Sequence, residues 1–482
     1  MAAELPFDPR AESLPTAPCW VDGEWITPSG AAVPVINPFT EAVIGECREA
    51  DADLLVRAVR AATSAAASWR LISVEERTEV LVRAADLIEK SQDVLGPLVS
   101  REMGMPIALA KATQAQLPAQ VLRSSAAAAR SFPWAEQIEG ATLVRRGAGV
   151  VGAITPWNMP VHQIVAKVSA AFAAGCSVVL KPSEQTPYDA LVLAALFDEA
   201  GIPRGLFNVV TGTGPVTGAA LAGQHGLARV SFTGSVAAGR AVAGLAAANL
   251  VPCTLELGGK SPAVILDDAD LSVVVPSVLR SGFVNSGQAC NATTRILVPS
   301  SRIEEVEELV RASLADFKMG DPLDPGTAQG PLVTRVQKQR VMGHLERAVA
   351  DGGRVLSSGA QTPERGWFVA PTVVAGLSAE AAAVREEIFG PVLVLLPYAD
   401  EEDAIRKAND SDYGLSAEVW SADRERAEAV AARLEVGQAK VNGVKTRERT
   451  GVPFGGVGLS GYGRELGAHG IQEMTEVTAV MS

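Results

Sequence analysis

Three residues of the 482-residue sequence have side chains suited to covalent chemistry on a carbonyl group. Cys290 lies in the small-residue run Gly287-Gln-Ala-Cys-Asn291, and Glu256 is flanked by leucines and followed by two glycines. Asn158 stands between two prolines, which hold its amide in a rigid turn. A thiolate is a nucleophile, apolar neighbours raise the pKa of a carboxylate toward that of a general base, and a fixed amide can donate to an oxyanion.

Each of these residues also has an ordinary structural interpretation. Most cysteines are buried and unreactive, a glutamate can end an edge strand, and an asparagine can simply form a turn. The four histidines, at positions 162, 225, 344 and 469, are all distant from Cys290 in sequence, so a Cys–His pair is not indicated. The thiol therefore needs activation by backbone dipoles, by a nearby cation such as a nicotinamide ring, or by a carboxylate base.

The segment Gly234-Ser-Val-Ala-Ala-Gly239 is a candidate nucleotide site. A glycine at the end of a strand, followed by the first turn of a helix, presents free N–H groups and the helix dipole to a pyrophosphate. The segment lacks the middle glycine of the usual dinucleotide fingerprint, so a plain strand-to-helix turn remains the alternative.

The elements that must position these residues alternate between strand and helix. Apolar runs predict strands at 149–154, 177–180, 206–210 and 229–232, and helical spacing predicts helices at 161–174 and 188–200, each followed by a glycine. This alternation indicates right-handed crossovers and a parallel doubly wound sheet. Ligands bind beyond the carboxyl ends of such strands, where the sequence places 156–158, 181–184, 212–214 and 234–235.

A second alternating series begins near Gly258. Strands are predicted at 295–298, 392–397, 417–420 and 439–442, with helices at 302–314, 401–409 and 422–434. Upstream, Ser73 and Glu76 form a capping-box pattern that opens a helical segment closed by Gly104. The fold class expected is therefore α/β, with two doubly wound domains and a cleft between them.

Composition narrows the function. The chain has 48% hydrophobic residues, and 42 Lys and Arg against 55 Asp and Glu give a net charge of −13. Such an acidic surface repels nucleic acid and anionic membranes, and the charge-free stretches are too short or too broken to span a bilayer. The five cysteines form no C-x-x-C pair, which is typical of neither a disulfide framework nor a zinc site, so no metal is expected. No secretory signal is evident, and a cytoplasmic protein is expected.

Seven motifs in one order carry a resemblance to the aldehyde dehydrogenase superfamily, which covers nearly the whole chain from Trp20 onward. They are Thr155-Pro-Trp-Asn158, Lys181-Pro-Ser-Glu184, Phe232-Thr-Gly-Ser235, Leu255-Glu-Leu-Gly-Gly-Lys-Ser261, Gly287-Gln-Ala-Cys290, Glu386-Glu-Ile-Phe-Gly-Pro391 and Pro453-Phe-Gly-Gly456. Any one of them could be accidental, whereas seven in the family's order leave little room for that.

The resemblance implies the catalytic roles. Cys290 attacks the aldehyde carbon, and the side-chain amide of Asn158 and the backbone N–H of Cys290 hold the oxyanion. Hydride then leaves to the cofactor, and Glu256 activates the water that hydrolyses the thioester. The reaction implied is NAD(P)-dependent oxidation of an aldehyde to a carboxylic acid.

The resemblance also implies the cofactor contacts. Lys181 and Glu184 hold the adenosine ribose, Trp157 and Ser235 lie along the pyrophosphate, and Glu387 and Phe389 position the nicotinamide ribose and ring. The full set expected is Ile154, Thr155, Pro156, Trp157, Lys181, Ser183, Glu184, Gly214, Phe232, Gly234, Ser235, Leu257, Glu387 and Phe389. Because the Glu184 carboxylate would repel a 2′-phosphate, NAD is expected to be preferred, with NADP possible.

Some positions depart from the family, and these bear on the substrate. Ala166 falls where several relatives that act on aliphatic aldehydes carry tryptophan, Met159 follows the asparagine, and Asn291 follows the cysteine. The segment 445–449 near the pocket mouth is unusually charged; a solvated loop is one interpretation, and anion binding by Arg447 or Arg449 is the other.

The resemblance implies three structural parts and a homodimer or homotetramer. Residues 1–124 and 148–257 are expected to form the NAD(P)-binding domain, 258–457 the catalytic domain, and 125–147 with 458–482 a small β oligomerisation element. Two other functions remain open. A CoA-acylating semialdehyde dehydrogenase generally lacks the base Glu256, and a structural protein such as a lens crystallin would not need an intact set of Cys290, Glu256 and Asn158.

Overall fold

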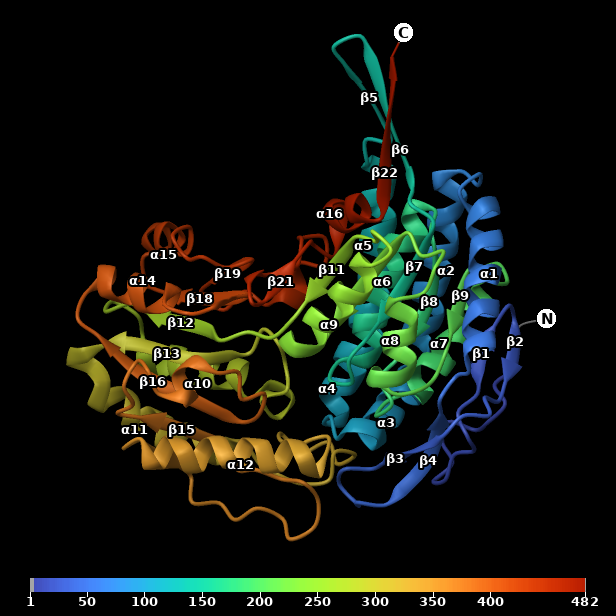
Figure 1. Cartoon of the computed structure of the whole chain (residues 1–482). Helices are drawn as coiled ribbons and strands as arrows, with labels where there is room; N and C mark the ends of the chain where they lie inside the picture. The colour runs from blue at the N-terminus through green and yellow to red at the C-terminus, as the bar shows by residue number, and fades with distance from the viewer. Residues whose placement is uncertain (1–3, 482) are drawn as a thin grey trace.

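The computed structural model describes residues 4–481. Residues 1–3 and 482, the outer ends of the expected first domain and of the expected oligomerisation element, lie outside this range. Two α/β halves lie side by side, and a narrow ribbon of strands projects from the first of them (Figure 1). The expected fold class, two α/β domains with a small β element, is confirmed.

The first half is built on an eight-stranded sheet in the order β2-β1-β9-β8-β7-β10-β11-β21. Its five parallel strands lie side by side in the order β9-β8-β7-β10-β11. The chain first adds strands on one side of β7 and then on the other, so the direction of winding reverses between β7 and β10. Ligands bind at such a reversal point in sheets of this kind. The strands are β1 (Cys19–Val21), β2 (Glu24–Ile26), β7 (Val150–Ile154), β8 (Ser177–Lys181), β9 (Phe207–Val209), β10 (Arg229–Thr233), β11 (Cys253–Glu256) and β21 (Gly461–Tyr462).

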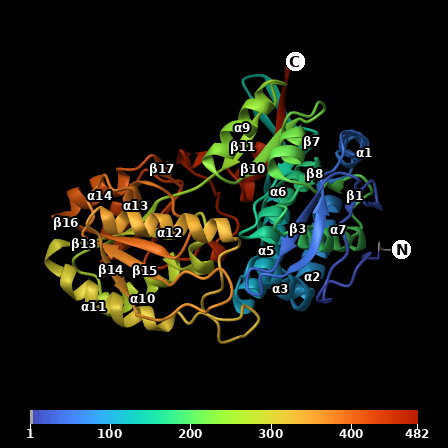
Figure 2. The same cartoon turned by 60° about the horizontal axis from the view of Figure 1, so that its bottom comes forward.

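Helices cover this sheet on both faces (Figures 1 and 2). They are α1 (Ala52–Trp69), α2 (Val74–Lys90), α3 (Gln92–Met103), α4 (Ile107–Lys111), α5 (Leu117–Ser131), α6 (Pro160–Ala174), α7 (Tyr188–Ala200), α8 (Ala219–Ala222) and α9 (Val236–Ala247), with π-helical turns η1 (Ala112–Gln116) and η2 (Gly214–Gly218). The capping box of Ser73 and Glu76 is confirmed. The segment that it opens is two helices, because α2 ends at Lys90 and α3 runs on to the left-handed Gly104.

The second half contains a seven-stranded sheet in the order β14-β15-β16-β13-β12-β18-β19, parallel except for β14. The strands are β12 (Ser261–Ile265), β13 (Thr293–Pro299), β14 (Arg354–Ser357), β15 (Thr372–Ala375), β16 (Val392–Tyr398), β18 (Ser416–Trp420) and β19 (Gln438–Val441). The helices are α10 (Leu271–Gly282), α11 (Ile303–Ser313), α12 (Arg335–Ala350), α13 (Ala382–Arg385), α14 (Glu401–Asn409) and α15 (Arg424–Ala431).

One of these helices is shorter than the sequence predicts. The prediction placed a helix over 422–434, whereas α15 covers 424–431. The side chain of Asp423 accepts hydrogen bonds from the backbone N–H groups of Glu425 and Arg426 and so fixes the start of the helix.

The projecting ribbon is a three-stranded antiparallel sheet in the order β22-β6-β5 (Figure 1). Its strands are β5 (Ala135–Ile138), β6 (Ala141–Gly147) and β22 (Thr475–Met481), and β22 pairs with β6 along its whole length. The ribbon is narrower than the expected element, because residues 125–131 belong to α5, β21 joins the first sheet, and α16 (Gly467–Glu473) packs against α5 and α6. Two minor sheets pair β3 (Ala32–Ile36) with β4 (Val43–Arg48) and β17 (Tyr413–Gly414) with β20 (Val457–Gly458).

Helix α6 is the structural centre of the first half. All but one of its residues are buried, and Gly175 ends it in a left-handed conformation with φ of 92°. One of the buried residues is a lysine, Lys167, whose side chain has no exposed surface. Among the described residues, no helix combines the length and the apolar composition needed to cross a bilayer.

Candidate active site

The carboxyl ends of β7, β8, β10 and β11 lie level with one another. Ile154 pairs with Lys181 on one side and with Phe232 on the other, and Thr233 pairs with Glu256. Parallel pairing in this register brings the ends of four strands to one edge of the sheet. The chain therefore leaves β7 toward Asn158 at the same edge of the sheet as the end of β11, which carries Glu256 and is separated from β7 by β10 alone.

A strained turn presents Cys290. Asn285, Ser286 and Gly287 have successive φ values of 51°, 56° and 73°, in a region that residues other than glycine rarely adopt. A Cβ atom on Gly287 would lie 2.1 Å from the carbonyl oxygen of Gly390, so only glycine fits there. The Ser286 hydroxyl donates to the Gly330 carbonyl at 2.7 Å and holds the turn in place.

The same turn is tied to Asn158 in the other half of the molecule. Nδ2 of Asn158 donates to the Gln288 carbonyl at 2.9 Å, and Nδ2 of Asn285 donates to the Asn158 carbonyl at 2.9 Å. The Gln288 side chain accepts from the backbone N–H of Val333 and donates to the Asn285 carbonyl. Sequence reasoning missed Asn285 and Gln288; the polar run that precedes Cys290 was the available signal.

Cys290 and Asn158 line one cavity of about 410 Å³ between the two halves. Ala166 and Met159, two of the positions that depart from the family, line the same cavity. Glu256 is not among the residues that line it. The cavity therefore brings the thiol and the amide together, whereas the Glu256 carboxylate is not part of its lining.

The Cys290 thiol is held in its protonated form. Burial raises the pKa of this thiol to about 12, and the carboxylates of Glu256 and Glu387 add to the rise, while backbone N–H groups at Asn291 and Cys290 oppose it. A thiolate in these surroundings needs an additional positive charge.

Glu256 is almost completely buried, and neither of its carboxylate oxygens has a hydrogen-bond partner among the described residues. Burial raises the pKa of this carboxyl group well above its ordinary value, and the nearby Glu465 carboxylate raises it further, whereas Lys167 and Arg464 lower it. The space for the side chain comes from Gly455, where a Cβ atom would lie 2.7 Å from Oε1 of Glu256. A buried, unpartnered carboxyl group of raised pKa has the properties of a general base near neutral pH.

Lys167 and Glu465 form a buried ion pair next to Glu256, which the sequence analysis did not predict. Nζ of Lys167 contacts Oε1 of Glu465 and donates to Oγ1 of Thr233 at 2.7 Å, and the Ser231 hydroxyl donates to the same Glu465 oxygen at 3.3 Å. Lys167 and Glu465 are 298 positions apart. The only local signal was a single charged residue inside the apolar run of 161–174.

The two glycines that follow Glu256 each make room for a different active-site group. A Cβ atom on Gly258 would lie 2.2 Å from Oε2 of Glu387, and one on Gly259 would lie 2.7 Å from the Cys290 carbonyl oxygen. The Gly259 N–H also donates to Oε1 of Glu387 at 3.1 Å. The pair of glycines thus lets the expected nicotinamide-ribose residue and the nucleophile approach one backbone segment.

The other expected cofactor residues surround the end of the first sheet. Nζ of Lys181 lies 3.1 Å from Oε2 of Glu184, and the ring of Trp157 meets Phe389 edge-on at 5.5 Å. Ser235 caps α9, whose first turn therefore begins at the point where the sheet reverses direction. Ile154, Thr155, Ser183, Phe232 and Leu257 are buried, whereas Pro156, Gly214 and Gly234 are half-buried.

These residues fit a dinucleotide. A Cβ atom on Gly214 would meet nothing within 4 Å, so the surface beside it is open. Oγ1 of Thr155 is buried without a partner among the described residues, and the first N–H groups of α9 suit a pyrophosphate. A buried lysine paired with a partly exposed carboxylate can bind ribose hydroxyl groups.

The fold and this site are those of a two-domain α/β oxidoreductase with a cysteine side chain in the cavity between the two halves. The chain belongs to the aldehyde dehydrogenase family, because the family profile matches residues 25–480. It is 42% identical to a 3-succinoylsemialdehyde-pyridine dehydrogenase of Pseudomonas sp. (96% of this chain, 98% of the relative). It is 40% identical to the geranial dehydrogenase of Castellaniella defragrans (94% and 96%).

The fold is also that of a solved family member. An aldehyde dehydrogenase mutant of Pseudomonas syringae, solved with NAD+ and octanal, superposes with a TM-score of 0.94 at 38% identity, covering 99% of this chain and 98% of that one. The resemblance inferred from the seven motifs is confirmed, and the protein is an enzyme that oxidises aldehydes.

The raised pKa of the thiol gives a prediction for the cofactor-free enzyme. Because the pKa of Cys290 is about 12, the rate of alkylation by iodoacetamide should rise about tenfold per pH unit from roughly pH 6.5 to 9.5 without a plateau. The measurement is the mass of the Cys290 peptide against time. Cys290→Ala is the control for alkylation elsewhere, and a plateau below about pH 9 would contradict the assigned environment.

Proposed function

We propose that the chain oxidises aldehydes to carboxylic acids through a thioester on Cys290, with Asn158 as oxyanion donor and Glu256 as the base for hydrolysis. One observation carries the proposal: Cys290 and Asn158 line the same cavity, and Glu256 is buried at the adjoining strand end without a partner. The shared cavity supports the roles of Cys290 and Asn158, and the buried, unpartnered carboxyl group of raised pKa supports the role of Glu256.

The steps follow from these groups. The Cys290 thiol gives up its proton to water, Sγ bonds to the aldehyde carbon as the carbonyl π bond breaks, and the oxygen gains the negative charge. One amide hydrogen of Asn158 is held by the Gln288 carbonyl, and the other would donate to this oxygen. Loss of hydride leaves a thioester. Glu256 removes a proton from water, the hydroxide displaces the thiolate, and the acid is released.

The cofactor is NAD, and the solved relative described above was crystallised with it. Bound NAD supplies the hydride acceptor and a fixed positive charge on its nicotinamide ring. Lys181 and Glu184 would hold the adenosine ribose, Ser235 and the start of α9 the pyrophosphate, and Glu387 the second ribose. Because Glu184 is ionisable and partly exposed, it disfavours a 2′-phosphate, so NAD is preferred over NADP.

One assay tests the function. Purified enzyme should form NADH from hexanal or benzaldehyde without CoA, with a higher kcat/KM for NAD than for NADP, and Cys290→Ala should form none while retaining the fold. Thioester release that depends on CoA would favour an acylating enzyme, and equal or better use of NADP would overturn the assignment to Glu184. Turnover by Cys290→Ala within tenfold of wild type would refute the proposed nucleophile.

Glu256→Gln separates the two halves of the reaction. The substitution keeps the shape of the side chain and removes the base, so one equivalent of NADH should form rapidly and steady turnover should fall about a hundredfold or more. Rapid-quench or stopped-flow absorbance measures both phases. If burst and steady state fell together, Glu256 would act on the thiol instead.

The pocket should accept bulky aldehydes, including aromatic and branched ones, at least as well as acetaldehyde. Ala166 lines the cavity with only a methyl group, beside the flexible Met159. Ala166→Trp should lower kcat/KM for benzaldehyde by roughly tenfold or more while sparing acetaldehyde, since the indole fills the space that the ring needs. Ala166→Leu should give an intermediate value, and melting temperature and NAD binding serve as controls. An unchanged benzaldehyde-to-acetaldehyde ratio would refute the role of Ala166.

We propose assembly into a homodimer or homotetramer through the ribbon of β5, β6 and β22. Strand β22 lies at the edge of its sheet, and nearly all of it is exposed. Val477, Val480 and Ile138 are about half exposed, and they form an apolar surface that edge pairing with a second chain would cover.

The scattered free cysteines support a reducing, cytoplasmic location.

A further inference from the structure

The cavity that contains Cys290 has two chemically different walls. The first half contributes the apolar groups of Leu109, Leu117, Met159 and Ala166, together with uncharged polar groups, among them Thr113, His162 and Gln163. The second half contributes four cations: Arg280 of α10, Lys440 of β19, and Lys445 and Arg447 of the loop that follows β19. Positive charge therefore gathers on one wall of the cavity, although the whole chain carries a net charge of −13.

The two carboxylates of the cavity do not neutralise this wall. Glu418 is paired with Lys440 at 3.1 Å and also accepts from the Ser281 hydroxyl, and both charged side chains of the pair are nearly buried. Glu465 is paired with Lys167. Each carboxylate is already matched by one cation.

Three cations remain without a partner. The side chains of Arg280, Lys445 and Arg447 are exposed, line the cavity and form no hydrogen bond or ion pair with any residue between 4 and 481. Like charges around one cavity repel one another, and an anion bound among them relieves that repulsion.

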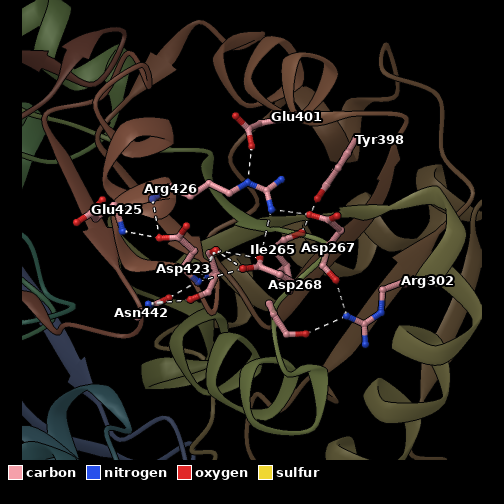
Figure 3. A network of polar contacts seen from close by, with 12 residues as sticks. Ile265, Asp267, Asp268, Arg302, Tyr398, Glu401, Asp423, Glu425, Arg426 and Asn442 are labelled. Atoms are coloured by element: carbon pink, nitrogen blue, oxygen red, sulfur yellow. Dashed lines mark hydrogen bonds and ion pairs between the residues drawn. The ribbon is translucent and has the colours of Figure 1, made fainter.

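The loop that carries Lys445 and Arg447 is fixed at several points. At its start, Asn442 exchanges two 3.0 Å hydrogen bonds with the backbone of Ser421, next to the polar network around Asp268 and Arg426 (Figure 3). In the middle, Nδ2 of Asn291 donates to Oγ1 of Thr446 at 3.4 Å, directly after the nucleophile.

The end of the loop reaches the first half of the molecule, where the hydroxyls of Thr450 and Ser124 lie 2.6 Å apart. The backbone that carries Lys445 and Arg447 is therefore held at the cavity by contacts with both halves of the molecule.

We infer that the enzyme selects aldehydes that carry a carboxylate at the end remote from the aldehyde group, and that Arg280 and Arg447 bind that carboxylate. This inference rests on the proposed function and deepens it. The apolar wall would hold the middle of such a substrate, and guanidinium groups bind carboxylates through two parallel hydrogen bonds. The charged wall would also raise the local concentration of anions at a protein that otherwise repels them.

The test compares 4-carboxybenzaldehyde with its methyl ester, which has the same ring and nearly the same length but no charge. In wild type at low salt, kcat/KM should be about tenfold higher for the carboxylate, and this advantage should shrink as ionic strength rises because salt screens exposed charges. Arg447→Gln and Arg280→Gln should each lower kcat/KM for the carboxylate about fivefold or more and leave the ester within twofold.

Arg449 provides a matched control. It lies in the same loop and is exposed, but it is not among the residues that line the cavity, and its guanidinium donates to the Glu448 carbonyl. Arg449→Gln should leave both substrates unchanged. If it reduced carboxylate turnover as much as Arg447→Gln does, the effect would come from general surface charge and the inference would fail.

Binding to Cys290→Ala, measured calorimetrically, separates this inference from the proposed function. Cys290→Ala should bind 4-carboxybenzaldehyde more tightly than its ester, and the double variant Cys290→Ala/Arg447→Gln should lose this difference. That result supports the carboxylate site even if no aldehyde is oxidised. Oxidation of both aldehydes with the ester preferred, or loss of both substrates together in Arg447→Gln, overturns the inference and leaves the proposed function intact.

Discussion

The hydrogen bond from the Asn158 side chain to the Gln288 carbonyl, at 2.9 Å, is the contact on which the active site depends. It joins the end of a strand in one half of the molecule to the turn before the nucleophile in the other. The reciprocal bond from Asn285 to the Asn158 backbone makes the link rigid. Because catalysis of this kind needs the oxyanion donor and the attacking sulfur at fixed relative positions, the link between domains is also a condition for the chemistry.

Close backbone approach is the second constraint, and glycine meets it at several points. Gly258, Gly259, Gly287 and Gly455 each stand where a Cβ atom would meet Glu387, the Cys290 carbonyl, the Gly390 carbonyl or Glu256. Those contacts bring the Cys290 backbone and the carboxyl groups of Glu256 and Glu387 into a small volume. The same crowding explains the electrostatics, since burial together with neighbouring carboxylates raises the pKa values of Cys290 and Glu256.

The two halves of the chain contribute different groups to the cavity. The first half supplies apolar surface and the buried pair of Lys167 and Glu465 beside Glu256, whereas the second half supplies the thiol and four cationic side chains. A substrate bound between them touches both domains. The loop that follows β19 also contacts both halves, because hydrogen bonds tie it to Ser421 in the second half and to Ser124 in the first.

The sequence by itself determined the alternation of elements, the motifs and the family. Helices α7 and α14 begin and end where their sequence patterns do, because the spacing of apolar residues and the glycine or aspartate at a helix end are local properties. The tertiary structure alone decided that Lys167 meets Glu465, that Asn285 and Gln288 hold the nucleophile turn, and that Arg447 lines the cavity whereas Arg449 does not. Those contacts join residues far apart in the chain, or depend on which way a loop side chain faces, so packing between domains fixes them and local sequence preference does not.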